Sequence, residues 1–317
     1  MSVAVDIVSG FLGSGKTSLL RHVLAGGLRD ARVAVVMNEI GEIGIDGRVL
    51  TGLGGIEKLV ELSSGCICCS IDEYRFDVAI QDLVETARPD LIVIEATGVA
   101  DPGVLATRAR GAGLRIDGVI TVVDAAAVRR WLRDTVVARA QIAAADFLVI
   151  NKTDLVPAGE IASVERELRR VNRRAAMTQA EHGRVDLPVL FAPEVGSYRR
   201  RAAAERAGDV GHGDHLEADA IGAFIYRTGR RLRREQFEQA VARFPQEVFR
   251  AKGVVHFAGQ TGPWLFNYTC GRTDLESVRL PGGAADSQVV VIGREPARYR
   301  ARVLGALSRC EIAGAAT

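Results

Sequence analysis

A short apolar stretch near the start of the chain leads directly into a glycine-rich turn, and this combination constrains the fold more than any other feature. Residues 3–8 are mostly apolar, and residues 10–17 are Gly-Phe-Leu-Gly-Ser-Gly-Lys-Thr. This is the full G-x-x-x-x-G-K-[ST] pattern, with a strand expected before it and a helix after it, as a phosphate-binding loop requires. We therefore expect a nucleoside triphosphate to bind here.

Each part of this loop has a predicted task. Its glycines let the backbone present N–H groups to phosphate oxygens, and the helix that follows adds the positive end of its dipole. Lys16 is expected to reach the outer phosphates as part of the catalytic set, and Thr17 to ligate Mg²⁺. The other predicted nucleotide contacts in the loop are Gly10, Gly13, Ser14, Gly15 and Ser18.

A second pattern predicts which base is bound. Residues 147–150 form an apolar stretch, and Asn151-Lys152-Thr153-Asp154 follows it. The Asp154 carboxylate can accept hydrogen bonds from both the ring N–H and the exocyclic amine of guanine, whereas adenine offers no such donor pair. We expect Asn151, Lys152 and Asp154 to bind guanine, so GTP is favoured over ATP.

A third stretch supplies the acid that such a site needs. Residues 91–94 are apolar, as in a strand buried on both faces, and Glu95 and Gly98 follow. We expect Glu95 to hold a Mg²⁺-bound water or orient the attacking water, and the backbone N–H of Gly98 to meet the γ-phosphate. The alternative is an ordinary acid at a strand end.

Three of the five cysteines in the chain fall within four residues, as Cys66, Cys68 and Cys69. Thiolates favour Zn²⁺, Co²⁺ and Cu⁺, and three thiolates leave a tetrahedral shell open, which suits a metal that is released again. A redox dithiol and a set of buried structural cysteines are the alternatives. Cys270 and Cys310 stand alone and are expected to be small buried hydrophobic residues.

Five ordered motifs together resemble the CobW-type family of P-loop GTPases, relatives of the hydrogenase and urease nickel-insertion GTPases. They are GFLGSGKT (10–17), NEIGEIGID (38–46), GCICC (65–69), IEATGVADP (94–102) and NKTD (151–154). The resemblance implies a slow GTPase that binds Zn²⁺ or Co²⁺ at the cysteine motif and passes the metal to a client protein or cofactor pathway under nucleotide control. It also makes residues 38–46 a switch region.

The acidic side chains of this switch region are candidates for metal ligation. Glu39 and Glu42 are expected to complete the shell begun by the cysteines, and Asp46 to serve Mg²⁺. The alternative is a solvated acidic loop. Many members of the family carry a histidine-rich run, and this chain has only His212 and His215 in the corresponding region, which makes metal storage an unsupported role.

The order of the predicted elements indicates an α/β fold with a doubly wound, mostly parallel P-loop sheet and a second, smaller α/β domain. We expect a GTPase domain at 1–196, a polar linker at 197–220 and a CobW-type C-terminal domain at 221–317. Strands are expected near 3–8, 33–37, 91–95, 118–123 and 146–150, and helices near 16–25, 72–87, 101–111, 126–133 and 158–172. The second domain is expected to hold a small mixed sheet, in the order β-α-β-β-β-α, with its helices on one face.

Composition excludes several other classes. The chain has 317 residues, 48% of them hydrophobic, and a net charge of +2, so nothing in its charge calls for nucleic acid or a membrane surface. Two arginine clusters, 199–201 and 230–234, lack interleaved aromatic residues and are expected to be solvated faces or a docking patch for a client. No span of about 18 apolar residues and no leader are visible, so we expect a cytoplasmic protein.

The expected partners are guanine nucleotide, an unknown client and a second copy of the chain in a nucleotide- or metal-dependent homodimer. Two other functions stay open from the sequence. One is a GTP-gated adaptor with a structural or redox-active cysteine cluster. The other is a small-molecule P-loop kinase, which would leave the guanine and cysteine motifs without a use.

Overall fold

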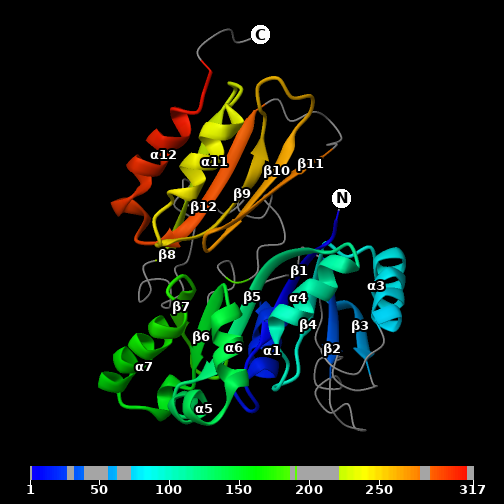
Figure 1. Cartoon of the computed structure of the whole chain (residues 1–317), viewed down its shortest axis with the longest axis vertical. Helices are drawn as coiled ribbons and strands as arrows, with labels where there is room; N and C mark the ends of the chain where they lie inside the picture. The colour runs from blue at the N-terminus through cyan, green and yellow to red at the C-terminus, as the bar shows by residue number, and fades with distance from the viewer. Residues whose placement is uncertain are drawn as a thin grey trace. The chain divides into compact units, whose positions relative to one another are not determined.

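The computed structural model describes residues 2–26, 32–38, 56–62, 73–185, 190, 221–278 and 286–312. The chain divides into two compact units, one within Ser2–Pro193 and one within Glu194–Thr317, and each is described by itself (Figure 1). The predicted linker at 197–220 lies outside the described residues, and the predicted domain limits stay predictions.

The first unit is built on a seven-stranded sheet in the order β3-β2-β4-β1-β5-β6-β7, and every neighbouring pair is parallel. This confirms the predicted parallel α/β fold. The strands are β1 (Ala4–Ser9), β2 (Val33–Asn38), β3 (Ile56–Leu62), β4 (Leu91–Glu95), β5 (Arg115–Asp124), β6 (Phe147–Asn151) and β7 (Ala176–Gln179).

Helices connect these strands and bury their apolar sides against the sheet (Figure 1). They are α1 (Lys16–Gly26), α3 (Glu73–Ala87), α4 (Pro102–Gly111), α5 (Val128–Asp134), α6 (Val136–Ala144) and α7 (Ala158–Val171), with the short 3-10 turn η1 (Thr153–Leu155). One core cluster joins α3 and α4 to β1, β2 and β4, and another joins α5, α6 and α7 to β5, β6 and β7. Because β1, β4 and β6 are buried on both faces, their sequences are almost continuously apolar.

The second unit holds a five-stranded sheet in the order β11-β10-β9-β12-β8. Its elements are β8 (Ile221–Thr228), α11 (Arg234–Ala242), β9 (Val248–Val255), β10 (Trp264–Thr269), β11 (Arg272–Ser277), β12 (Ser287–Arg294), the 3-10 turn η2 (Pro296–Arg298) and α12 (Arg300–Ser308). Figure 1 shows α11 and α12 side by side along this sheet, and both helices share one core cluster with it, as expected.

The expectation of a mixed sheet in the second unit is wrong, because every strand pair described there is antiparallel. The reason lies in the connections. Only Cys270 and Gly271 separate β10 from β11, and a turn that short joins antiparallel strands alone. The strand β11 was also not predicted. At the centre of this unit, the ring of Phe237 on α11 packs edge-on against Phe257 at 5.6 Å and Phe266 at 5.0 Å.

Among the helices that the structure describes, none has both the length and the hydropathy needed to cross a bilayer.

Candidate functional site

The glycine-rich loop lies at the carboxyl edge of the first sheet, directly after β1, and two of its glycines are required by close contacts. Gly10 has φ +139°, and a Cβ there would lie 2.3 Å from the carbonyl oxygen of Val122. Gly15 has φ +103°, and a Cβ there would lie 2.3 Å from Nδ2 of Asn151. Neither a positive φ nor such an approach suits a residue with a side chain, so the loop follows a path that only glycine permits.

The two residues that follow this loop begin α1 and turn toward its polar groups. Nζ of Lys16 donates to the carbonyl oxygen of Gly10 at 3.0 Å, and the hydroxyl of Thr17 donates to Oε1 of Glu95 at 3.2 Å. Glu95 ends β4, which neighbours β1, and only 6% of its surface is exposed. A hydroxyl beside a carboxylate is a donor set that Mg²⁺ accepts. Thr17 and Glu95 therefore fit the predicted magnesium site.

The turn after Glu95 packs directly against the glycine-rich loop. A Cβ on Gly98 would lie 2.5 Å from Cδ2 and 2.8 Å from the backbone nitrogen of Leu12. The buried side chain of Gln141, on α6, donates to the carbonyl oxygens of Gly98 and Ala100 at 3.1 and 3.0 Å. Sequence reasoning missed Gln141, because nothing in a helical glutamine indicates a contact some forty residues away. It fixes the turn whose N–H is predicted to meet the γ-phosphate.

Asn151 joins this loop to the predicted base-binding segment. Its Nδ2 donates to the carbonyl oxygen of Ser14 at 2.9 Å, and its Oδ1 accepts from the backbone N–H of Gly183 at 3.0 Å. The side chain of Asn151 is buried, so these bonds are shielded from competing water. One amide thus fixes the predicted phosphate site relative to the segment after β7.

Lys152 and Asp154 follow Asn151 in the chain, and their contacts differ from those of Asn151. Lys152 has φ +62° and places its ammonium 2.7 Å from Oδ2 of Asp124, at the end of β5. Asp154, within η1, is exposed, and its carboxylate has no hydrogen bond or ion pair with any residue in the described part of the chain. An accessible carboxylate of this kind is free to accept from a ligand.

Gly183 is a further residue that the sequence did not single out. It has φ +74°, and a Cβ there would lie 2.6 Å from the backbone nitrogen of Leu19 and 2.7 Å from the carbonyl carbon of Ser18. The segment after β7 therefore packs on the first turn of α1, where the predicted phosphate contacts begin. A glycine that follows His182 outside any known motif gave no signal of this role.

The predicted transition-metal ligands Cys66, Cys68, Cys69, Glu39 and Glu42 lie outside the described residues, as do Asp46, His212 and His215. Within the ranges that the structure describes, no group of three or more His, Cys, Asp or Glu side chains is arranged to hold a metal ion. What the structure does show is where these segments begin. Residues 39–50 follow the end of β2, residues 63–72 follow the end of β3, and Asn38 pairs with Leu62 across these parallel strands.

The two lone cysteines differ from each other. Cys310 is only 2% exposed, which confirms the prediction for it. The prediction for Cys270 is wrong, because this residue lies half-exposed in the turn between β10 and β11 with φ +45°.

The glycine-rich loop after β1, the parallel sheet and the second unit define a P-loop nucleotide-binding protein with a separate C-terminal unit. Comparison with known families supports this class. The family model "CobW/HypB/UreG, nucleotide-binding domain" matches residues 4–179, and the model "Cobalamin synthesis protein cobW C-terminal domain" matches residues 221–311. The chain belongs to the CobW/HypB/UreG family.

Several curated proteins are similar to this chain. The zinc chaperone CobW of a Sinorhizobium species is 29% identical, with 92% of each chain covered. The zinc-regulated GTPase metalloprotein activator 1 of Schizosaccharomyces pombe is 37% identical over 58% of this chain and 47% of its own length. The zinc chaperone YjiA of Escherichia coli is 36% identical over 60% of this chain and 61% of its own length. Among solved structures, Zn(II)-bound YjiA GTPase from E. coli aligns with a TM-score of 0.47 at 22% identity, covering 98% of this chain and 100% of that one.

The packing of Gly183 leads to a test of the site. We expect Gly183→Ala to weaken binding of a fluorescent GDP analogue at least tenfold, because the added methyl group forces the segment away from α1 and breaks its bond to Asn151. Titration of the analogue by fluorescence measures this. Gly159→Ala is the matched control, since a Cβ there meets nothing within 4 Å. Equal affinity of both variants would contradict the assignment.

Proposed function

We propose that this chain is a GTP-dependent metallochaperone that binds Zn²⁺ at Cys66, Cys68 and Cys69 and couples slow GTP hydrolysis to metal transfer to a client protein or cofactor pathway. Its membership of the CobW/HypB/UreG family supports the general class, a metal-handling GTPase. The names of its relatives, zinc chaperones and a zinc-regulated GTPase, favour zinc over cobalt as the cargo. Thiolate ligands alone do not separate the two metals.

The order of the strands is the observation that carries this proposal. In the sequence of neighbours β3-β2-β4-β1, the segment with the cysteines follows β3, the acidic switch segment follows β2, Glu95 ends β4 and the glycine-rich loop follows β1. Parallel neighbouring strands end at the same edge of the sheet, so all four segments begin at that edge. At about 4.8 Å between strands, the outermost two are roughly 14 Å apart. A change at the γ-phosphate can therefore reach the cysteine segment through adjacent chain segments.

The nucleotide half of the mechanism uses residues whose geometry is described. Lys16 and the loop N–H groups would bind the phosphates, and Gly98, held by Gln141, would meet the γ-phosphate. Thr17 would ligate Mg²⁺, with Asp46 as a second proposed ligand and Glu95 acting through water, and this ion would neutralise charge on the phosphate oxygens. We assign no arginine finger or catalytic glutamine, and we therefore propose that intrinsic turnover is slow.

The metal half uses residues outside the described ranges. Three thiolates would bind Zn²⁺, and Glu39 or Glu42 from the switch segment would complete a tetrahedral shell when GTP orders that segment. Loss of the γ-phosphate would then remove a ligand and loosen the metal toward a client. We further propose that the protein acts in the cytoplasm, where thiols stay reduced, and that nucleotide or metal promotes a homodimer.

Guanine selection by Asp154 is tested by a change of base. We expect Asp154→Asn to weaken GTP binding by roughly 30-fold or more, since one guanine N–H then faces the amide NH₂, and a lost bond with an unsatisfied donor costs about 2 kcal/mol. Xanthosine triphosphate, which has a carbonyl where guanine has an amine, should bind this variant better than GTP. Competition against a fluorescent nucleotide measures both affinities. Asp134→Asn, which removes a charge at another exposed position, at the end of α5, should change neither.

The cysteine site is tested with Co²⁺ as a spectroscopic probe. We expect Cys68→Ala to abolish the Co²⁺–thiolate absorbance and weaken Zn²⁺ binding at least 100-fold, while basal GTP hydrolysis continues. Cys270→Ala removes a half-exposed thiol in the other unit and should leave both unchanged. Full metal binding by Cys68→Ala would contradict the metallochaperone proposal and favour a GTP-gated adaptor in which the cysteine cluster is structural.

A further inference from the structure

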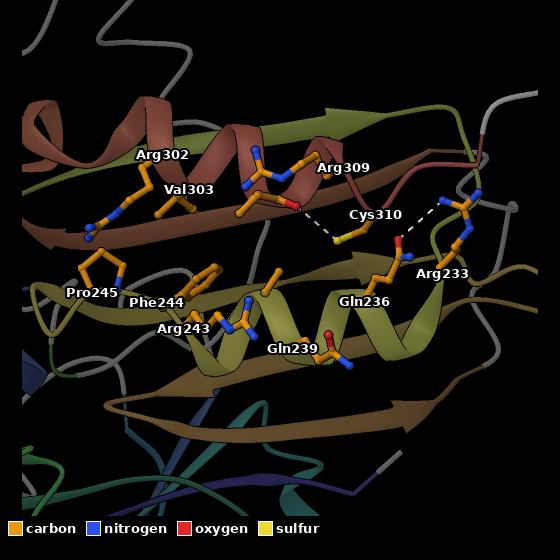
Figure 2. A pocket seen from close by; sticks show the side chains of 12 residues that line it. Arg233, Gln236, Gln239, Arg243, Phe244, Pro245, Arg302, Val303, Arg309 and Cys310 are labelled. Atoms are coloured by element: carbon orange, nitrogen blue, oxygen red, sulfur yellow. Dashed lines mark hydrogen bonds between the residues drawn. The ribbon is translucent and has the colours of Figure 1, made fainter.

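A groove of about 630 Å³ lies between α11 and α12 in the second unit (Figure 2). This volume falls within the range of about 300–1,000 Å³ that ligand sites occupy. Arg233, Arg243, Arg302 and Arg309 line it, and none of the described residues that line it is acidic. A concave surface with four cationic side chains and no carboxylate attracts an anion.

The four arginines stand at the ends of two helices that run in opposite directions. The backbone N–H of Arg233, which precedes α11, donates to the carbonyl oxygen of Cys310, just after α12, at 2.8 Å. The backbones of Arg233 and Arg309 are therefore at one end of the groove, and a guanidinium nitrogen of Arg309 reaches back along α12, 3.6 Å from where a Cβ on Gly305 would lie. Arg243 follows α11 and Arg302 lies in the first turn of α12, and both flank the other end (Figure 2). The Cα atoms of Arg233 and Arg243 are about 15 Å apart along α11.

None of these four guanidinium groups has a carboxylate partner in the described part of the chain. Arg233 contacts only neutral acceptors, the side-chain oxygen of Gln236 at 3.5 Å and the backbone oxygen of Glu311 at 3.3 Å. Some arginines outside the groove do have such a partner, since Arg234 pairs with Glu238 at 2.8 Å and Arg298 with Glu295 at 2.7 Å. In the described part of the chain, the groove thus gathers four cations that no carboxylate pairs with.

Helix dipoles do not account for this set. Arg243 and Arg309 are at the C-caps of their helices, where a cation is favoured. Arg233 is at the N-cap of α11 and Arg302 is in the first turn of α12, where a cation is disfavoured. The helix dipoles therefore do not stabilise two of the four charges, Arg233 and Arg302.

Among the described residues that line the groove, none supplies a counter-charge. The one titratable group among them besides the arginines is Cys310, and burial raises the pKa of its thiol, which Arg309 and Arg233 offset only in part. The thiol donates to the carbonyl oxygen of Ala306 at 3.2 Å and stays neutral at physiological pH. Apolar side chains also line the groove, and Phe244, Pro245 and Val303 lie beside Arg243 and Arg302 (Figure 2). Gln236, Gln239 and Ala240 line it along α11, so the lining combines cations, amides and apolar surface.

We propose that the α11–α12 groove binds an extended acidic segment of a partner protein, with its carboxylates on the arginines and its apolar side chains against Phe244, Pro245 and Val303. Arginine binds carboxylates through two parallel hydrogen bonds. An extended chain rises about 3.3 Å per residue, so four to five residues cover the roughly 15 Å between the Cα atoms of Arg233 and Arg243. A single phosphate is too small to reach along this length, and a nucleic-acid backbone has no apolar side chain to set against Phe244 and Val303. This inference does not depend on the nucleotide or metal chemistry.

The test uses the full chain and a fluorescein-labelled peptide, Asp-Glu-Ala-Leu-Ala-Asp-Glu, with binding followed by anisotropy at low salt. The double variant Arg302→Gln with Arg309→Gln removes two of the four cations that line the groove. The control, Arg298→Gln with Arg300→Gln, removes the same charge from exposed positions outside the groove. We expect at least tenfold weaker binding for the groove variant and less than twofold for the control. Thermal unfolding and GTP hydrolysis should match wild type in both.

Equal weakening by both double variants would mean generic charge attraction and would overturn the proposal, as would no binding by wild type. Displacement of the peptide by millimolar inorganic phosphate or by an oligothymidylate, at lower concentration than by unlabelled peptide, would also overturn it in favour of a phosphate ligand. A charge exchange gives an independent check. Arg302→Glu should bind the acidic peptide more weakly than wild type does. It should bind a second peptide more tightly than wild type does, in which the last two acidic residues are replaced by lysines.

Discussion

The buried amide of Asn151 is the interaction on which the arrangement of the first unit depends. It holds the glycine-rich loop through the carbonyl of Ser14 and the segment after β7 through the N–H of Gly183. Both bonds are buried, and a buried polar group left without its partner costs roughly 1–3 kcal/mol. Gly15 approaches the same amide too closely to carry a side chain. The glycine-rich loop, the segment at Asn151 and the segment after β7 therefore pack together around this amide. The predicted phosphate and base sites are thus held together by one buried amide.

The second constraint is the parallel sheet itself. Parallel strands bring all their carboxyl ends to one edge, and the neighbour order puts Glu95 between the glycine-rich loop and the ends of β2 and β3. A metal site at residues 63–72 and a switch at 39–50 would begin beside the acid predicted to hold a Mg²⁺-bound water or orient the attacking water. The coupling that we propose follows from adjacency in the sheet and requires no long-range pathway.

The sequence predicted the parts of the fold whose signals are local. The stretch before the glycine-rich loop and the apolar runs before Glu95 and Asn151 gave β1, β4 and β6 because strands buried on both faces are continuously apolar. The strands that were missed are β3, with Glu57, Lys58 and Glu61, β7, which has only four residues, and β11, which is largely polar. All three are edge strands, where charge is tolerated and the apolar signal is weak.

The tertiary contacts of the site were beyond sequence reasoning. Gln141 reaches the turn at Gly98 from a helix that was not predicted, and Gly183 meets α1 across the fold. In the second unit the arginines at 230–234 were noted as a cluster, yet the groove uses only Arg233 from it. The other three come from positions that adjoin it only when α11 and α12 pair antiparallel. Such pairings depend on tertiary packing, which no local pattern specifies.

The central claim, that nucleotide and metal binding are coupled, is tested most directly by reciprocity. A nonhydrolysable GTP analogue should bind more tightly when Zn²⁺ is present, and Zn²⁺ should bind more tightly, by the same factor, when the analogue replaces GDP in an otherwise identical titration, since linkage requires equal factors around the cycle. Isothermal titration of the analogue with and without Zn²⁺ gives the first factor. The account predicts a tightening of at least fivefold that Cys68→Ala removes. Equal affinity of the analogue with and without zinc would contradict it.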